Sequence, residues 1–189
     1  MRFENKVAFG TALLLVLLSA GSALSAWRRA QEPVPVPAEL RRLSDARQLI
    51  IPVDGVALSD LTDSWHAPRG EGRLHEGVDI MAQLGTPVRA TMAGTIAKLF
   101  VSKRGGNTIY QFDPSGRLTL YYAHLNGYAP RLKAGDHVVQ GQLIGYVGKS
   151  GNATVTHLHF EIQHADANRR WWRGEAFNPY LALMAGRAD

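Results

Sequence analysis

The chain has 189 residues, of which 46% are hydrophobic and 20% charged, with no cysteine and a formal net charge of +5 at pH 7. This length fits one domain with a core and an appendage, and the composition excludes general disorder and a multi-span membrane protein. The absence of cysteine excludes a disulfide framework and a cysteine nucleophile. A mildly basic surface suits an anionic polymer, although solubility alone explains the charge equally well.

An apolar segment follows the short basic start of the chain. No charged residue occurs between Lys6 and Arg28, a pattern typical of an export signal. Ala23-Leu24-Ser25 fits a cleavage site, whereas the length of the run and the Trp27-Arg28-Arg29 boundary fit a retained anchor over residues 7–27. Both alternatives export the rest of the chain, and we expect it in the periplasm of a diderm cell, where the anchor would hold it at the inner membrane.

Three parts follow one another along the chain. Residues 1–27 are the signal peptide or signal anchor, residues 28–50 a linker, and residues 51–185 the main domain. In the linker, the run from Glu32 to Pro37 has alternating prolines, which fix φ and remove backbone donors, so we expect an extended spacer. The charged stretch from Ala38 to Leu49 permits a short helix.

From Ile50 onward, short apolar or alternating runs are separated by glycine-rich turns, a pattern typical of many short strands. No long amphipathic helix is evident between Ile50 and His164, so the predicted fold class is all-β. Asn178 as the cap and Pro179 at the first helical position predict a short C-terminal helix. The expected strands are Gly77–Ile80, Gly94–Val101, Asn107–Asp113, Leu118–Leu125, His137–Val147 with a break near Gly141, and Leu158–His164.

Two clusters of side chains are suited to binding a divalent metal. One holds His75 and Asp79, and the other holds His157 and His159. Side chains at positions i, i+2 and i+4 of an extended strand share one face, so the members of each pair can converge. Imidazole and carboxylate together form the mixed N/O set that zinc accepts. This reasoning leaves open which histidine of the second cluster binds the metal.

Other polar and aromatic residues have simpler interpretations. Position 79 is Asp and Gly77 disfavours a helix, so Glu76 does not belong to a helical His-Glu-x-x-His signature and is expected to be a solvated carboxylate. Trp171 and Trp172 lie among arginines, which suits stacking on sugars or contact with a membrane, but a loop packed on its own domain is the more ordinary outcome. His66 lies in a loop before the first cluster, where a surface position is expected and the cleft is the alternative. His137 is expected at the start of a strand and His164 near the end of one, and neither is given a role in the site.

Several motifs together resemble the lysostaphin-type (LytM-type) family of zinc metallopeptidases, which cut peptide bonds in bacterial peptidoglycan. The resemblance covers Gly72 to Ile162 and implies compact antiparallel sheets of the lysostaphin-like, duplicated hybrid motif type, here with an N-terminal apolar helix added. The matching segments are His75-x-x-x-Asp79, Gly85-Thr86-Pro87-Val88, Ala93-Gly94-Thr95-Ile96, Tyr122-Ala123-His124-Leu125, the run from Gly135 to Gln142, Ser150-Gly151-Asn152-Ala153-Thr154 and His157-Leu158-His159-Phe160-Glu161.

By this resemblance, His75, Asp79 and His159 are the protein ligands of one zinc ion per chain, which keeps an open position for water. His124 and His157 are the unliganded catalytic pair. One of them accepts a proton from the water while the other donates to the oxyanion or the leaving amine.

The implied function is zinc-dependent endopeptidase activity on the peptide stems or cross-links of peptidoglycan during cell-wall remodelling. One alternative is a non-enzymatic regulator that binds the wall and activates another hydrolase such as an amidase. A second is a wall-binding module whose zinc is structural. The expected partners are peptidoglycan and, through the N-terminal segment, a membrane. No phosphate loop or nucleic-acid motif is present in the sequence.

Overall fold

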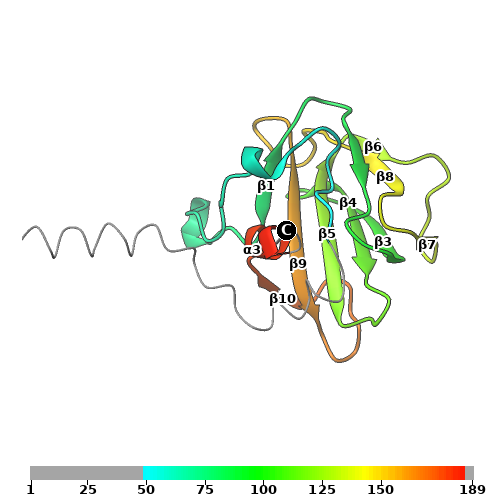
Figure 1. Cartoon of the computed structure of the whole chain (residues 1–189). Coiled ribbons are helices and arrows are strands. Elements are labelled where there is room, and N and C mark those ends of the chain that lie inside the picture. The colour runs from blue at the N-terminus through cyan, green and yellow to red at the C-terminus, as the bar shows by residue number, and fades with distance from the viewer. Residues whose placement is uncertain (1–48, 186–189) are drawn as a thin grey trace, which may run out of the picture. The chain divides into compact units, whose positions relative to one another are not determined.

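The computed structural model describes residues 49–185 (Figure 1). The predicted N-terminal helix, with its signal or anchor role, and the proline-rich spacer lie outside the described residues. Between residues 49 and 185, no helix has the length and apolar character needed to cross a membrane.

Strands make up most of the described domain, and a short helix, α3, closes it. Two 3-10 turns, η1 at Leu58–Asp60 and η2 at Gly70–Gly72, precede the strands, and α3 spans Pro179–Ala185. The strands are β1 Val78–Met81, β2 Pro87–Arg89, β3 Gly94–Ser102, β4 Gly106–Phe112, β5 Leu118–Leu125, β6 Gly127–Tyr128, β7 His137–Val138, β8 Leu143–Tyr146, β9 His157–Ala165 and β10 Gly174–Phe177.

These strands form two antiparallel sheets. The larger has the order β1-β9-β5-β4-β3-β7, with β10 also paired to β9, and the smaller has the order β2-β8-β6. In Figure 1, the long strand β9 runs through the middle of the domain, and α3 lies beside it. The all-β prediction is therefore confirmed, as is the short C-terminal helix.

The strand predictions agree best for the long segments. β5 has the predicted bounds, β3 differs by one residue at its C-terminal end, and β4 and β9 differ by one residue at each end. The segment from His137 to Val147 was predicted as one strand with a break, and it forms two strands in different sheets. Gly141 has φ 80° in the turn between them, so β7 pairs with β3 while β8 pairs with β2 and β6. The two short strands β2 and β6 and the edge strand β10 were not predicted.

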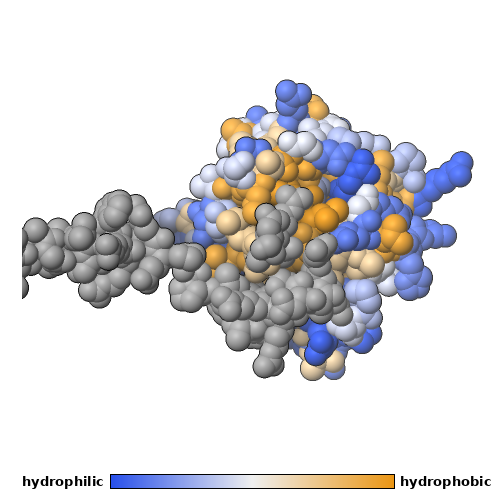
Figure 2. All heavy atoms as spheres, in the orientation of Figure 1, coloured by the Kyte–Doolittle hydropathy of each residue, from blue (hydrophilic) through white to orange (hydrophobic). Residues whose placement is uncertain are grey.

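Alternation along β9 separates the core from the open face of the large sheet. Leu158, Phe160 and Ile162 are buried, as their alternation with the histidines predicted. Figure 2 shows hydrophobic residues gathered over the middle of the face seen in Figure 1 and hydrophilic residues around its rim. Helix α3 adds Ala182 and Leu183 to the core, and the Asn178 side chain accepts hydrogen bonds from its first turn.

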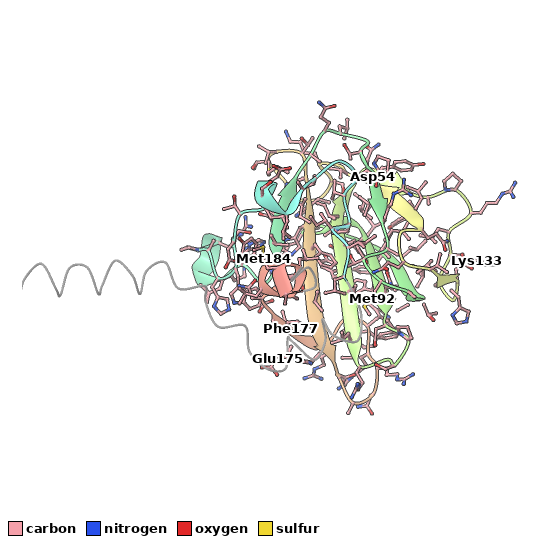
Figure 3. The ribbon with its side chains drawn as sticks, viewed as in Figure 1. Asp54, Met92, Lys133, Glu175, Phe177 and Met184 are labelled. Carbon is pink, nitrogen blue, oxygen red and sulfur yellow. The ribbon has the colours of Figure 1, made fainter. Side chains whose placement is uncertain are left out.

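A buried polar network joins three of these segments behind the open face. The Tyr122 hydroxyl accepts a hydrogen bond from the Thr91 backbone N–H at 3.1 Å and donates one to Gln111 Oε1 at 3.1 Å. The Gln111 amide then donates a hydrogen bond to the carbonyl of Met92. In Figure 3, Met92 lies among the strands, and Phe177 and Met184 mark the C-terminal part of the domain. Tyr122 is the first residue of the Tyr122-Ala123-His124-Leu125 motif, and this network gives its hydroxyl a structural role.

We expect Tyr122→Phe to lower the free energy of unfolding by about 1–3 kcal/mol, because the change leaves the buried Thr91 N–H and Gln111 oxygen without their partner. Urea unfolding measures this difference. Tyr128→Phe is the matched control, since the Tyr128 hydroxyl donates to the Phe100 carbonyl near the surface, where water can replace it. An equal loss in both variants would contradict the role given to the buried network.

Candidate metal centre

The pairing of β1 with β9 brings the two predicted metal-binding clusters together. Asp79 on β1 lies directly opposite His159 on β9, and His75 reaches the same point from just before β1, with a bend at Gly77 between His75 and the strand. One ligand atom from each of His75, Asp79 and His159 lies within 4.8 Å of the other two. Asp79 Oδ1 is 3.1 Å from His75 Nε2 and 3.0 Å from His159 Nδ1.

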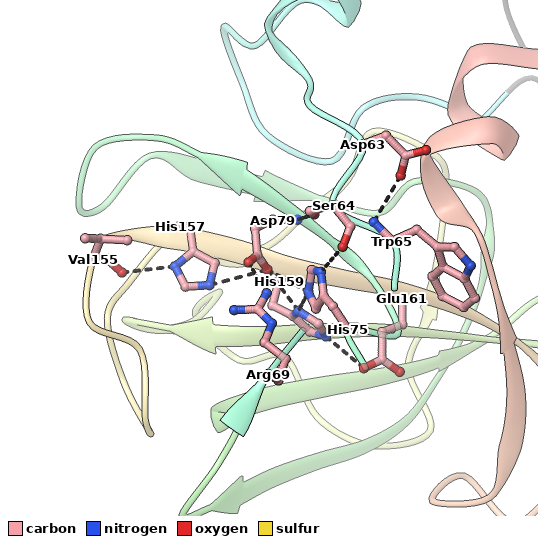
Figure 4. A network of polar contacts seen from close by, with 10 residues as sticks. All are labelled: Asp63, Ser64, Trp65, Arg69, His75, Asp79, Val155, His157, His159 and Glu161. Atoms are coloured by element: carbon pink, nitrogen blue, oxygen red, sulfur yellow. Dashed lines mark hydrogen bonds and ion pairs between the residues drawn. The ribbon is translucent and has the colours of Figure 1, made fainter. Parts of the chain in front are cut away.

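Each of these three side chains is held by a second contact on its far side (Figure 4). His75 Nδ1 donates to the Ser64 carbonyl at 2.7 Å, which leaves Nε2 facing the centre. His159 Nε2 donates to Glu161 Oε1 at 2.8 Å, which leaves Nδ1 facing the centre. Asp79 Oδ2 accepts from the Arg69 guanidinium, which leaves Oδ1 facing the centre. Such outer contacts orient metal ligands and fix the tautomer of ligating histidines.

His157 lies beside this group with a different geometry. Its Nδ1 donates to the Val155 carbonyl at 3.0 Å, so Nε2 is the basic nitrogen, 3.6 Å from Asp79 Oδ1. The ring of His124 packs against it, with the two ring centroids 4.8 Å apart. The assignment of His159 as the ligand and of His157 with His124 as the unliganded pair stays a prediction, and this geometry supports it.

Two loops hold His124 at the end of β5. Its φ is 62°, a left-handed conformation that is strained for a residue with a side chain. The His124 backbone N–H donates to the Gly105 carbonyl at 2.7 Å, and its Nδ1 donates to the Ser150 carbonyl at 2.9 Å. A Cβ added to Gly151 would lie 2.2 Å from the Arg104 carbonyl oxygen, so glycine allows the two loops to pack backbone against backbone. The Ser150-Gly151 part of the sequence motif thus positions His124.

Electrostatics favour a positive charge at this point. Burial favours the neutral form of His159, but hydrogen bonds to Asp79 and Glu161 outweigh it and raise the His159 pKa to about 9. Burial also favours protonated Asp79, yet hydrogen bonds, first those from His159 and His75, hold its pKa far below the usual range. Burial lowers the pKa of His124 to about 4, against the opposing hydrogen bond to Ser150, so its Nε2 is unprotonated at neutral pH.

The donor set fits a zinc ion. Two imidazole nitrogens and one carboxylate oxygen form a three-ligand set of the kind found in catalytic zinc sites, in which the fourth position stays open. The three donors converge on the side of the group that faces a cleft, and His124, His157 and Tyr121 line the same cleft. The Asp79 and Glu161 carboxylates favour a second proton on His159, and a bound cation would take the place of the proton on Nδ1.

The remaining predicted residues lie as expected or add new features. Glu76 is exposed at the cleft rim, and the exposed His66 and His137, with the half-buried His164, do not line the cleft. Sequence reasoning gave no role to Ser64, Arg69 or Glu161 as outer contacts. The alternation of β9 indicated only that Glu161 shares a face with the histidines, whereas the other two come from the loop before His75 and carried no signal.

Comparison with known proteins gives matches to peptidases. A family model described as Peptidase family M23 matches residues 73–179. The L-Ala--D-Glu endopeptidase of Bacillus subtilis (strain 168) is 36% identical over 131 residues, which cover 65% of this chain and 39% of that protein. This chain therefore corresponds to less than half the length of that relative.

Solved structures give the same grouping. The catalytic domain of the antimicrobial peptidase lysostaphin from Staphylococcus simulans is 29% identical with a TM-score of 0.55, and the match covers 76% of this chain and 97% of that domain. A zinc-containing peptidase from Vibrio cholerae is 27% identical with a TM-score of 0.53, and the match covers 73% of this chain and 39% of that one.

Gly77→Ala is expected to weaken zinc binding by about 10- to 100-fold, the range seen when the contacts that orient a ligand are disturbed. A Cβ at this position would lie 2.7 Å from His159 Cε1 and 2.7 Å from the Phe160 carbonyl oxygen, so the His159 ring must move. Competition with a zinc chelator measures the affinity. Gly127→Ala is the control, because nothing lies within 4 Å of its added Cβ. Unchanged affinity in Gly77→Ala would contradict the assignment of His159 as a ligand.

Proposed function

The chain belongs to Peptidase family M23, and we propose that its described domain is a zinc-dependent endopeptidase that hydrolyses peptide stems or cross-links of bacterial peptidoglycan. The observation that carries this proposal is the convergence of His75, Asp79 and His159 beside two further histidines in one cleft. The names of the relatives support the substrate class, since they include a peptidoglycan DD-endopeptidase and an L-Ala--D-Glu endopeptidase.

The chemistry divides between the metal and the two unliganded histidines. When bound, zinc supplies a Lewis acid that polarises the scissile carbonyl and lowers the pKa of a coordinated water. His124 and His157 each donate Nδ1–H to a backbone carbonyl, so each presents a basic Nε2. One of these nitrogens accepts the proton released as the peptide is attacked, and the same proton is then passed to the leaving amine, either by that histidine or through the other one. The fixed Nδ1 contacts keep both rings oriented throughout.

An intact ligand set also argues for an enzyme rather than a regulator of another hydrolase. A regulator needs a surface but no open metal position, whereas here the donors converge on a cleft together with two proton-transfer groups. A structural zinc site would be closed by a fourth protein ligand. Within the described residues, the group suited to a metal contains three donors.

The roles of the histidines give a direct test. We expect His159→Ala to lose both zinc and hydrolysis of purified peptidoglycan. His124→Ala should keep zinc, because it supplies no ligand, and should lower kcat by about 10²- to 10⁴-fold, the usual contribution of general acid–base catalysis. Zinc content is measured by elemental analysis, and the released fragments by mass spectrometry.

Two outcomes would overturn this assignment. Equal zinc loss in both variants would mean that His124 is a ligand. If the zinc-loaded wild-type chain leaves peptidoglycan undigested but stimulates a wall amidase, the regulator alternative is correct.

We also propose that the chain is exported and stays attached to the inner membrane through residues 7–27, from which the proline-rich spacer lets the domain reach the wall. The uncharged run and its Trp27-Arg28-Arg29 boundary support this proposal. The full-length chain should stay in the membrane pellet after a high-salt wash. A mature N-terminus near Ala26, found by N-terminal sequencing, would instead show a cleaved signal peptide.

A further inference from the structure

A row of side chains crosses the open face of the large sheet, beginning at the metal centre. Glu161, which holds His159, pairs with Tyr121 on β5. Tyr121 pairs with Tyr110 on β4, which in turn pairs with Lys98 on β3. The Tyr121 ring lies edge-on to His159, with the ring centroids 6.0 Å apart. Because adjacent strands lie about 4.8 Å apart, the distance from β5 to β3 is about 10 Å.

The loop between β9 and β10 adds two tryptophans to this row. The Trp171 ring centroid is 4.8 Å from that of Tyr110, 5.3 Å from that of Phe100 and 5.1 Å from that of Trp172. Tyr110 and Tyr121 are 4.6 Å apart. These spacings are typical of packed aromatic pairs. We call Tyr121, Tyr110, Trp171, Phe100 and Trp172 the aromatic row.

The aromatic row is accessible at the surface. Trp172 is 60% exposed and Phe100 40% exposed, whereas Trp171 and the two tyrosines are partly buried. Lys98 Nζ lies 6.0 Å from the Trp171 ring centroid. The aromatic rings contact one another, and a contiguous exposed apolar patch, unlike a single exposed side chain, can mark an interaction site. Since Tyr121 also lines the cleft of the metal centre, the row and the cleft form one continuous surface.

We propose that the aromatic row binds the glycan chain of the polymer whose peptide enters the cleft, an inference that rests on the proposed function. A sugar ring presents C–H groups on its face and hydroxyl groups at its edge. Tyrosine and tryptophan match this pattern, because each combines a broad apolar ring with one polar O–H or N–H group.

The arrangement favours a glycan over a membrane as the occupant. A membrane-binding surface presents aromatic side chains that project outward into the lipid interface. Here Trp172 is the most exposed member of the row, whereas Trp171, Tyr110 and Tyr121 pack ring against ring and extend sideways across the strands from the cleft. A polymer that places its peptide at the metal centre would lay its attached sugar chain along this surface.

The test measures binding of the full-length, zinc-loaded chain to peptide-free glycan strands, prepared from purified peptidoglycan by removing the stem peptides with an amidase. We expect Trp172→Ala to weaken binding by about threefold to tenfold, in line with the loss of one aromatic contact. Trp172→Phe should retain most of the affinity, because it keeps an aromatic ring. Leu84→Ala is the control, since Leu84 is 61% exposed and lies outside the row.

The same variants are also measured for binding to anionic phospholipid vesicles. The proposal would be overturned if Trp172→Ala bound the glycan strands with wild-type affinity, whether or not its binding to the vesicles was weakened. The result is independent of hydrolysis, because the glycan probe has no peptide to cut. If the chain binds glycan through Trp172 but cuts no peptide, the proposed enzyme activity is wrong and the glycan-binding surface is supported. If it cuts peptide but does not bind glycan, the enzyme activity is supported and the glycan-binding surface is wrong.

Discussion

The antiparallel pairing of β1 with β9 is the constraint on which the metal centre depends. It sets Asp79 opposite His159, although the two residues are 80 positions apart in the sequence. The neighbouring pairing of β5 with β9 sets Ala123 on the other side of His159, one residue before His124. Since side chains alternate between the two faces of a sheet, a shift of one residue in either ladder would turn a site residue into the core.

The outer contacts then convert proximity into a defined centre. Without them, each imidazole could present either nitrogen, and the Asp79 carboxylate could rotate. Ser64 occupies one nitrogen of His75, Glu161 occupies one nitrogen of His159, and Arg69 occupies one oxygen of Asp79. The remaining donor atoms, His75 Nε2, Asp79 Oδ1 and His159 Nδ1, lie close together. A positive charge between them offsets the repulsion between their lone pairs. The raised pKa of His159 has the same origin, because the neighbouring Asp79 and Glu161 carboxylates favour a positive charge there.

The sequence predicted the parts of the fold that local pattern determines. β9 is long and its sequence alternates, so both its position and its buried face could be predicted. β5 is buried along most of its length, and only its position was predicted. β2 and β6 have three and two residues, too few for a period to be recognised, and they exist because of their partner β8. The break at Gly141 was visible, but the change of sheet was not, since sheet membership depends on distant partners.

The site was predicted unevenly for the same reason. Residue chemistry and spacing identified the two clusters, but the distinction between His157 and His159 came from a family resemblance, because both lie on the same face of one strand. The structure supplies the physical difference between them. His157 follows Val155, whose carbonyl occupies its Nδ1, whereas Glu161 occupies the Nε2 of His159. The two rings therefore present different nitrogens to Asp79, a distinction that depends on backbone conformation and neighbours rather than on residue type.

His124 shows what such positioning costs. A left-handed conformation in a residue other than glycine costs about 1–3 kcal/mol, and it persists only where the surroundings enforce it. Here the ladder of β5 with β9 ends at Ala123, and the Gly105 and Ser150 carbonyls accept hydrogen bonds from the His124 backbone N–H and ring N–H. An ordinary continuation of β5 would alternate past Ala123 and direct the next side chain to the opposite face of the sheet. The strained φ turns the His124 ring back toward His157. The loops that contain Gly105 and Ser150 therefore position His124 beside His157, although neither loop supplies a metal-binding side chain.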